Sequence, residues 1–517
     1  MYFKKILGLS GLRIIYAVFG LAYSILQVRF FGTSRGVEVF FVATTVSYMV
    51  ISLTQSGQLC EFFLPVYLSI RTNHGKPAAH RAFSVLINRF AVFFSILLII
   101  FYFLSPFIVA LMAPGFSEAD IELCVKMFRV FLIFLELQFI NSFIDVTLNA
   151  EKIFGRVELA AILNSIISLI LLILFYQTFG VWILVITLFV GKVIEFMITI
   201  IFVKKVGIKY SMIWYEKTFD TKSFFRLMFT TSGYVGATQI FSMIFTAVAT
   251  LLPQGTYAIF KYVQQISSKA SGILVAPLST VFFSHFSGSV STGEKDLEKK
   301  MQDPILYSSL LGLSLTGLVI LLGQEIINVL WKSKIMSDYF LHIGYWMLII
   351  NFVGFTLSAI GSIYRRVAVS LDKGKYLYRF WIGGQIISGL LSYLIIPPLG
   401  WFGLSIVTFL NAFLLAAGSI WVSRKCDINF YKTVNFKALF SIILSMFTFI
   451  AISFSLNYFL KTQVSISLFI AIIIKLIVAV LLGSGLLFFR HRELFNKLIF
   501  FLRPFFLKVN ASEHYRP

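Results

Sequence analysis

Long apolar runs recur along almost the whole chain, and short stretches of glycine, proline and charged residues separate them. Each run holds about twenty or more residues, which is enough for a helix to cross a hydrocarbon core of roughly 30 Å. No stretch between the runs is long enough to form a sizeable soluble domain. The pattern predicts an all-α polytopic membrane protein with about fourteen transmembrane helices. The predicted spans are residues 6–31, 37–68, 85–112, 121–149, 157–178, 181–203, 223–252, 255–286, 304–331, 338–365, 377–396, 399–422, 436–460 and 464–489.

The composition agrees with a membrane protein. Of the 517 residues, 59% are hydrophobic and 13% are charged, whereas about a quarter of the residues in a soluble domain are charged. The net charge of +22 also occurs in proteins that bind nucleic acid. In a membrane chain it is explained more simply by basic cytoplasmic loops and attraction to anionic lipid, so we expect no nucleic-acid partner.

Basic residues gather in every second connection between the predicted spans. Because cytoplasmic loops carry an excess of lysine and arginine, we expect both termini in the cytoplasm of a bacterium, with the protein in its inner membrane and residues 491–517 as a basic tail. The first run, 6–31, is longer than a signal-peptide core and lacks a cleavage site, so we expect it to be retained as a span. The basic connections include Arg71, Lys76 and Arg81, then Lys152 and Arg156, Lys204 to Arg226, Lys295 to Lys300, Arg365 to Arg379, and Arg424 to Lys437.

The chain resembles itself at a shift of 220 residues. Phe62-Phe63 falls on Phe282-Phe283, and Phe179-Gly180-Val181-Trp182 falls on Leu399-Gly400-Trp401-Phe402. Matches this short also arise by chance among apolar residues. We interpret them as two parallel six-helix lobes, 1–205 and 220–425, around a central cavity, since an even number of spans returns the chain to the same side. Residues 436–490 then form two extra C-terminal helices.

Cysteine and histidine show no spacing typical of a metal site. The three cysteines lie in or beside different apolar runs without CxxC spacing, and the six histidines form no HxxxH or HExxH pair. We therefore expect neither a metal nor another cofactor.

Several short motifs occur in the same order as in a known family. They are Arg29-Phe30-Phe31-Gly32, Glu38 to Ala43, Gly57, Phe62-Phe63-Leu64-Pro65, Met112 to Phe116, Leu148-Asn149-Ala150, Ser271 to Leu274 and Leu410-Asn411-Ala412. Together they resemble the MurJ/MviN lipid II flippases of the multidrug/oligosaccharidyl-lipid/polysaccharide (MOP) exporter superfamily. The resemblance implies a transporter rather than an enzyme. Its substrate would be a polyprenyl-diphosphate-linked glycan, moved across the membrane by alternating access for cell-wall or surface polysaccharide synthesis. We expect a monomer.

The chain departs from this family at the residues that bind the diphosphate. The family carries arginines in the central cavity on its first, second and eighth helices. Aligning the motifs puts Ala17, Tyr23, Ile51, Ser52 and Gln265 at those positions. The resemblance therefore leaves the identity of the glycan open, including whether it is lipid II.

Ionisable residues inside the predicted spans are candidate site residues. A charge at the bilayer centre costs at least about 2.5–3.5 kcal/mol on insertion scales, so it needs a partner or a wet cavity. Lys261 and Lys269 each lie one helical turn from Gln265, on one stripe of the run 255–286. Such cations can hold a diphosphate, although both lysines could instead extend to the membrane interface. The full candidate set is Arg13, Glu61, Arg89, Arg129, Glu136, Lys261, Gln265 and Lys269.

Two further pairs of charges lie in the first lobe. Lys192 and Glu195 are three residues apart, and we expect them to pair along one helix face. Arg129 and Glu136 are seven residues apart and too distant for a simple contact, so they either bind across to other helices or line the cavity.

Three other functions remain as alternatives. A multidrug/cation antiporter of the same superfamily needs a buried carboxylate, which Glu61, Glu136 or Asp145 would supply. A membrane glycosyltransferase ordinarily needs catalytic groups on a substantial outer loop, and the outward connections here are short. An inactive flippase-like partner in an envelope complex would explain the missing arginines.

Overall fold

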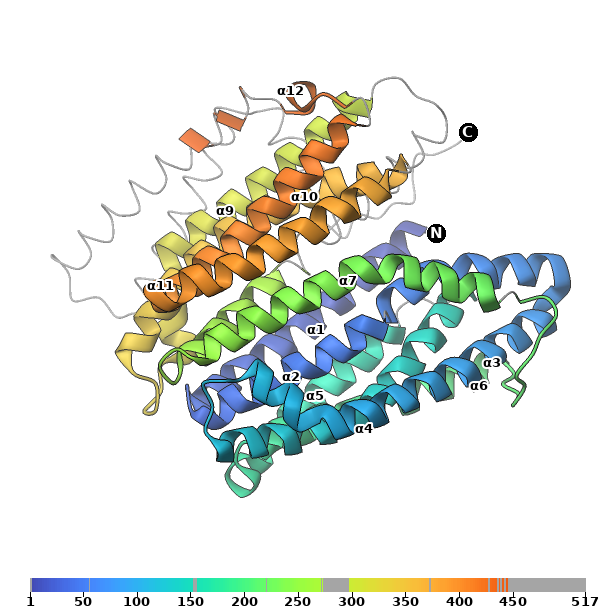
Figure 1. Ribbon diagram of the computed structural model, residues 1–517, viewed down its shortest axis with the longest axis horizontal. Coiled ribbons are helices and arrows are strands. Elements are labelled where there is room, and N and C mark those ends of the chain that lie inside the picture. Colours follow the sequence, from blue (N-terminus) through green and yellow to red (C-terminus); the bar gives the residue numbers. More distant parts are fainter. Residues whose placement is uncertain are drawn as a thin grey trace. The chain divides into compact units, whose positions relative to one another are not determined.

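The computed structural model describes residues 2–54, 56–151, 156–219, 221–270, 272, 297–371, 373–425 and 428–434, together with 437, 439–440 and 443–444. Every regular element in this part of the chain is helical (Figure 1). The helices are α1 (Tyr2–Phe31), α2 (Arg35–Thr54), α3 (Ser56–Met112), α4 (Glu118–Ala150), α5 (Arg156–Phe179), α6 (Trp182–Val206), α7 (Thr221–Thr250), α9 (Leu297–Trp331), α10 (Asp338–Ser370), α11 (Gly374–Arg424) and α12 (Phe430–Thr433). A further helical segment covers residues 256–270.

Seven of the described helices are long and apolar enough to cross a membrane. The all-α polytopic fold predicted from the sequence is therefore confirmed. The predicted spans 436–460 and 464–489 lie almost wholly outside the described residues, so the total of about fourteen stays a prediction.

Two of the breaks that the sequence predicts between spans coincide with kinks at glycines. Gly75, whose φ is 83° and ψ 169°, divides α3 into two helices, and Gly400, whose φ is 56° and ψ −129°, divides α11. Glycine adopts a positive φ without the steric cost that other residues incur.

The chain forms two compact units. The first contains described residues of Met1–Ile273, Trp331–Met347 and Lys375–Leu414. The second contains those of Leu274–Leu330, Leu348–Gly374 and Leu415–Pro517. The two six-helix lobes inferred from the repeat stay a prediction.

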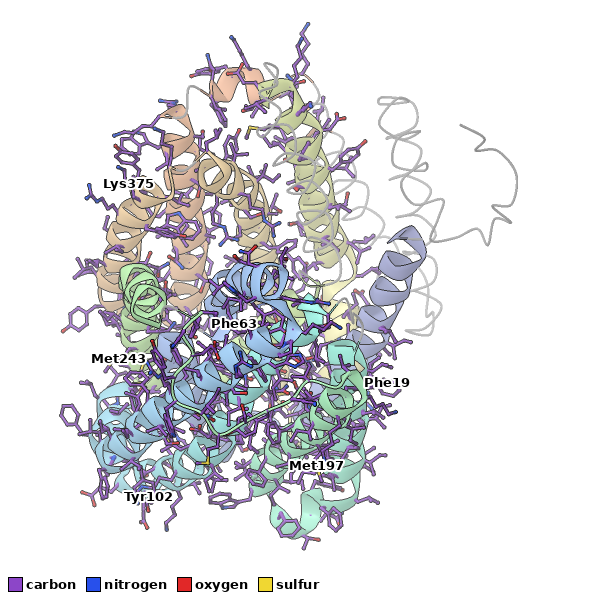
Figure 2. The ribbon with its side chains drawn as sticks, turned by 90° about the vertical axis from the view of Figure 1, so that its right-hand side faces the viewer. Phe19, Phe63, Tyr102, Met197, Met243 and Lys375 are labelled. Atoms are coloured by element: carbon purple, nitrogen blue, oxygen red, sulfur yellow. The ribbon has the colours of Figure 1, made fainter. Side chains whose placement is uncertain are left out.

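Aromatic packing holds the first unit together where α4 packs against α2, α3 and α6. The rings of Phe94 and Phe139 stack with their centroids 4.3 Å apart, and Phe63 and Phe90 both pack against Phe143. Figure 2 labels Phe63 among the packed helices. α1 packs against α5, and its hydrogen bond to α6 is described below.

The described part of the connection between α6 and α7, residues 207–219, is fastened along α3. The Asn88 amide donates to the carbonyl oxygens of Ser211 and Ile213, at 3.3 and 2.8 Å. Arg81 binds Glu216 with 2.6 Å between Nε and Oε2. This hydrogen bond holds the pKa of Glu216 below its usual range. The connection is therefore an ordered strap on α3 rather than a loose linker.

The second unit has its own apolar core. Ile305 of α9 packs with Ile363 and Val367 of α10, and Ile428 joins them. The Tyr364 hydroxyl hydrogen-bonds Thr433 Oγ1 at 2.7 Å, which fixes α12 to α10.

Candidate functional site

A polar stripe runs along one face of α1. Tyr16, Gly20, Ser24 and Gln27 follow one another at spacings of three or four residues, so they share a face. The helical segment 256–270 crosses this face in the opposite direction. Its Tyr262 hydroxyl donates to the Gly32 carbonyl oxygen at 2.9 Å.

Lys269 reaches the centre of the stripe. Its ammonium donates to the Gly20 carbonyl oxygen and to Ser24 Oγ, the latter at 2.6 Å. Among the residues that the structure describes, no carboxylate pairs with Lys269. An ammonium has three donors, so after these two bonds it keeps a donor and an uncompensated positive charge. This lysine is therefore bound inside the first unit.

Two amide groups near this lysine have unmet hydrogen-bonding capacity. Gln27 is only 1% exposed, and its Nε2 has no hydrogen-bond partner in the described part of the chain. Gln265 lies one turn before Lys269, and its buried Oε1 likewise has no hydrogen-bond partner in the described part of the chain. A buried polar group without a partner costs about 1–3 kcal/mol. A cation and two buried amide groups with unmet hydrogen-bonding capacity thus lie along α1 and the helical segment that packs on it.

A second intramembrane cluster lies on α6. Lys192 Nζ is 2.9 Å from Glu195 Oε2, which confirms the pairing predicted from their spacing. Asn141 of α4 donates to the other carboxylate oxygen at 3.3 Å.

Arg129 and Glu136 bind separately. Arg129 of α4 donates to Ser105 Oγ at 3.0 Å and lies over the Tyr102 ring, 4.4 Å from its centroid, so it joins α4 to α3. Glu136 is half-buried, and its Oε2 is buried without a partner among the described residues.

The remaining predicted residues have varied surroundings. Lys261 lies over the Tyr257 ring, 5.2 Å from its centroid. Arg89 donates to the Trp214 carbonyl oxygen at 2.8 Å, which makes it part of the strap attachment. The side chains of Arg13 and Glu61 lie outside the described residues. The structure thus brings Lys269 to α1, with Gln265 one turn before it, whereas Arg89 and Arg129 make their contacts elsewhere.

The positions aligned with the family's arginines carry other roles. Ala17 and Ile51 are buried apolar residues. The Tyr23 hydroxyl hydrogen-bonds Thr187 Oγ1 at 2.7 Å and so joins α1 to α6. Lys269 therefore supplies positive charge to α1 from a different position, one turn from Gln265.

One end of the first unit is sealed by a buried carboxylate that sequence reasoning missed. Glu38 is 2% exposed, and its Oε1 accepts from the backbone N–H groups of Gly255 and Tyr257, at 2.8 and 3.2 Å. Its Oε2 accepts from Arg35 at 2.9 Å. The only local signal was Arg35 three residues before Glu38, because the other partners are over two hundred residues away.

Glycines allow the turns at this end to interlock. A Cβ on Gly255 would lie 2.5 Å from the Phe340 ring and 2.9 Å from Thr33. A Cβ on Gly115 would lie 2.0 Å from the Thr250 carbonyl oxygen. We call this end, formed by the turns 32–34, 113–117, 251–255 and 332–337, the sealed end.

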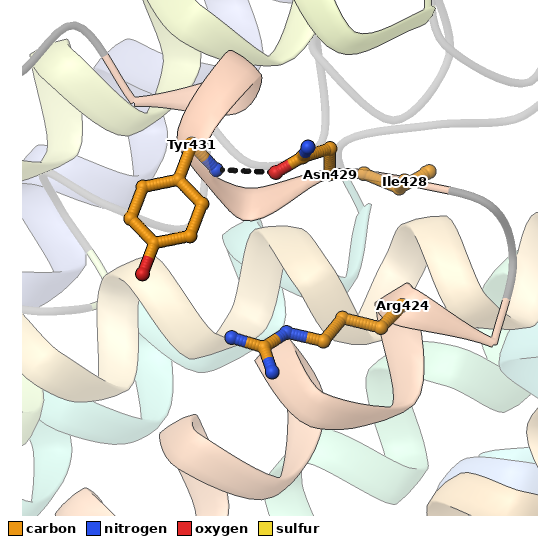
Figure 3. A pocket seen from close by; sticks show the side chains of 4 residues that line it. All are labelled: Arg424, Ile428, Asn429 and Tyr431. Carbon is orange, nitrogen blue, oxygen red and sulfur yellow. Dashed lines mark hydrogen bonds between the residues drawn. The ribbon is translucent and has the colours of Figure 1, made fainter.

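The second unit has a shallow pocket of about 440 Å³ where α11 meets α12. Arg424, Ile428, Asn429 and Tyr431 line it, and the Tyr431 backbone N–H donates to Asn429 Oδ1 at 2.9 Å (Figure 3).

Comparison with known proteins gives the family. The family described as "Lipid II flippase MurJ" matches residues 28–475. The chain belongs to the MurJ family. As a MurJ protein it is a multi-pass transporter of the inner membrane and not an enzyme, as the sequence predicted.

Relatives and solved structures agree with this assignment. The probable lipid II flippase MurJ of Buchnera aphidicola subsp. Acyrthosiphon pisum is 23% identical over 65% of this chain and 67% of its own length. The lipid II flippase MurJ of Burkholderia cenocepacia is 22% identical over 55% and 57%. The match thus spans about two thirds or less of these relatives.

Two solved structures share the fold. A lipid II flippase MurJ in an inward closed conformation has a TM-score of 0.79 and 18% identity, and covers 94% of this chain and 99% of its own. An inward-facing multidrug resistance MATE transporter of the MOP superfamily has a TM-score of 0.65 and 15% identity, and covers 81% and 98%.

Proposed function

We propose that this protein moves a polyprenyl-diphosphate-linked glycan precursor across the inner membrane, and that the substrate is the peptidoglycan precursor lipid II. The observation that carries this proposal concerns Lys269. Its ammonium donates to the Gly20 carbonyl oxygen and to Ser24 Oγ of α1, and it has no carboxylate partner in the described residues. Membership of the MurJ family supports the substrate class.

The chemistry of the α1 face suits a diphosphate-linked sugar. Ammonium donors satisfy phosphate oxygens, so Lys269 would bind the diphosphate with its remaining donor. The unmet amide groups of Gln27 and Gln265 would then bind polar groups of the head group. A cation without a counter-charge inside the membrane is costly, and binding an anionic head group removes that cost.

In an alternating-access transporter one side of the substrate site is closed while the other is open, and the sealed end has the contacts expected of a closed side. Opening this end requires Glu38 to leave the N–H groups of Gly255 and Tyr257. The described state is therefore closed at the sealed end, and we propose that the substrate enters from the opposite side and leaves after the seal opens.

We place both termini in the cytoplasm and the basic connections against anionic lipid of the inner leaflet, with the protein acting as a monomer. The charge distribution supports this orientation. Reporter fusions at the C-terminus should therefore be active only as cytoplasmic reporters, and a C-terminus on the outer face would contradict the topology.

Complementation tests the substrate. A bacterium depleted of its own lipid II flippase lyses unless another flippase replaces it, and expression of this chain should restore growth. Lys269→Gln should fail to do so at equal membrane abundance, whereas Lys126→Gln, which removes an exposed charge from α4, should succeed. If the wild-type chain is abundant in the membrane and does not restore growth, lipid II is not its substrate.

A further inference from the structure

The pair of Lys192 and Glu195 lies in the middle of a predicted membrane span. α6 runs from Trp182 to Val206, so the two residues lie about 15–20 Å from its start. Their side chains are 23% and 13% exposed. Removing two charges from water is expensive, and a hydrophobic pair of similar volume would often be as stable. Ionisable groups at such depth are therefore candidates for a functional role.

The pair lies next to the polar stripe of α1. Tyr23 of α1 is bonded to Thr187 of α6, and Gly36 beside the end of α1 contacts Val181 at the start of α6, so the two helices are antiparallel. From the Tyr23–Thr187 bond, Tyr16 lies about 10 Å farther along α1, and Lys192 and Glu195 lie about 8–12 Å farther along α6. The pair is therefore level with Tyr16.

Two tyrosines with exposed side chains lie near the pair. The charges of Lys192 and Glu195 interact electrostatically with the phenol of Tyr16, and that of Lys192 also with Tyr48. Tyr16 is 46% exposed and Tyr48 57%. Tyr48 is the single exposed residue between 35 and 52 on α2, an otherwise enclosed helix. Measured along the axis of α1, the pair thus lies about one helical turn, or roughly 6 Å of helix rise, from the level of Gly20, where Lys269 binds α1.

We propose that Lys192 is a second cation for the substrate diphosphate and that Glu195 is an internal anion that competes with the substrate for it. This inference rests on the proposed function. In the empty transporter, Glu195 neutralises Lys192. When the diphosphate binds, the Lys192 ammonium gives up its hydrogen bond to the Glu195 carboxylate and donates to a phosphate oxygen instead. Lys269 donates to the same diphosphate from its position at Gly20, about one turn of α1 away.

Asn141 provides the Glu195 carboxylate with a hydrogen-bond donor that remains when Lys192 moves to the diphosphate. Its amide donates to the Glu195 oxygen that Lys192 does not bind. Asn141 is 5% exposed, and its Oδ1 has no partner among the described residues. The carboxylate thus keeps one donor after Lys192 leaves it. Competition of this kind suits a transporter, because a site must hold its substrate firmly enough to load and loosely enough to unload.

The experiment is a double-mutant cycle that measures the dissociation constant of farnesyl diphosphate for the full-length protein in lipid nanodiscs. Glu195→Gln removes the competitor, so the dissociation constant should fall by about ten-fold. Lys192→Gln removes the cation, so the dissociation constant should rise by about ten-fold. The double variant should bind no more tightly than Lys192→Gln alone, because the effect of residue 195 acts through Lys192.

A second ion pair serves as the matched control. Lys126 and Glu122 of α4 are 2.6 Å apart, and their side chains are 60% and 68% exposed. Lys126→Gln and Glu122→Gln should leave binding unchanged. If Glu195→Gln does not fold, Glu195→Asp, which withdraws the carboxylate from Lys192, should also tighten binding.

The outcomes separate the two proposals. Wild-type binding with no opposite shift in the Lys192 and Glu195 variants would show that the pair is structural and would overturn this inference alone. A folded wild-type protein that does not bind farnesyl diphosphate would contradict the proposed function as well.

Discussion

Glu38 of α2 accepts a 2.8 Å hydrogen bond from the backbone N–H of Gly255, which lies 217 residues farther along the chain. Gly255 immediately precedes the helical segment 256–270, so the carboxylate lies at the positive end of that helix dipole. Together with Arg35 and Tyr257, this contact gives a buried negative charge three donors. The closed state of the sealed end therefore depends strongly on one residue.

Glu38→Gln should weaken the sealed end. Glutamine keeps the shape but lacks the charge, and hydrogen bonds to charged groups contribute about 1.5–3 kcal/mol. We expect a lower melting temperature and faster labelling of a cysteine placed at Thr33. Glu122→Gln is the control, since its exposed pair with Lys126 should contribute no more than about 1 kcal/mol. Equal behaviour of the two variants would show that Glu38 does not hold the seal.

Gly255→Ala should prevent closure of the sealed end. Its φ is +94°, and the new Cβ would lie 2.5 Å from the Phe340 ring and 2.9 Å from Thr33, so the turn or these side chains must move. Gly180→Ala is the matched control, because Gly180 also has a positive φ, +52°, and a Cβ added there would meet nothing within 4 Å. Both variants bear the cost of a left-handed residue, about 1–2 kcal/mol. Only Gly255→Ala should abolish transport, and equal activity of the two would argue against the interlock.

The strap on α3 should detach at acid pH. The hydrogen bond from Arg81 lowers the pKa of Glu216, so this bond stabilises the docked strap at pH values above the ordinary carboxyl pKa. That stabilisation is lost as the pH falls through the lowered pKa of the docked state. Hydrogen exchange of residues 208–216, corrected for the intrinsic pH dependence, should therefore increase on acidification. In Glu216→Gln, exchange should be faster at neutral pH and show no such transition, whereas a wild-type-like transition would assign it to another group.

Sequence reasoning succeeded where the signal is local. The apolar runs give the helices, and the three-residue spacing of Lys192 and Glu195 gives their contact. The four-residue spacing also places Gln265 and Lys269 on one face of their helix. In each case helical periodicity is enough, because the interacting residues belong to one element.

It failed where partners are distant in the chain. Asn88 binds the strap across more than 120 residues, and Glu38 binds a turn across 217 residues. A polar residue in an apolar run shows that a partner is needed but not which residue supplies it. Likewise, Lys269 appears as a charge in the sequence, while its bond to the Gly20 carbonyl depends on how two helices pack.

The central claim is that the Lys269 charge on α1 binds the diphosphate during transport. The most direct measurement is the rate at which purified protein in proteoliposomes moves lipid II between leaflets, with Lys269→Arg and Lys269→Gln compared at equal reconstitution. Arginine keeps a charged donor and should retain transport. Glutamine loses charge-assisted hydrogen bonding worth about 1.5–3 kcal/mol per bond, so transport should fall by about ten-fold or more. A folded glutamine variant that transports lipid II at the wild-type rate would contradict the account.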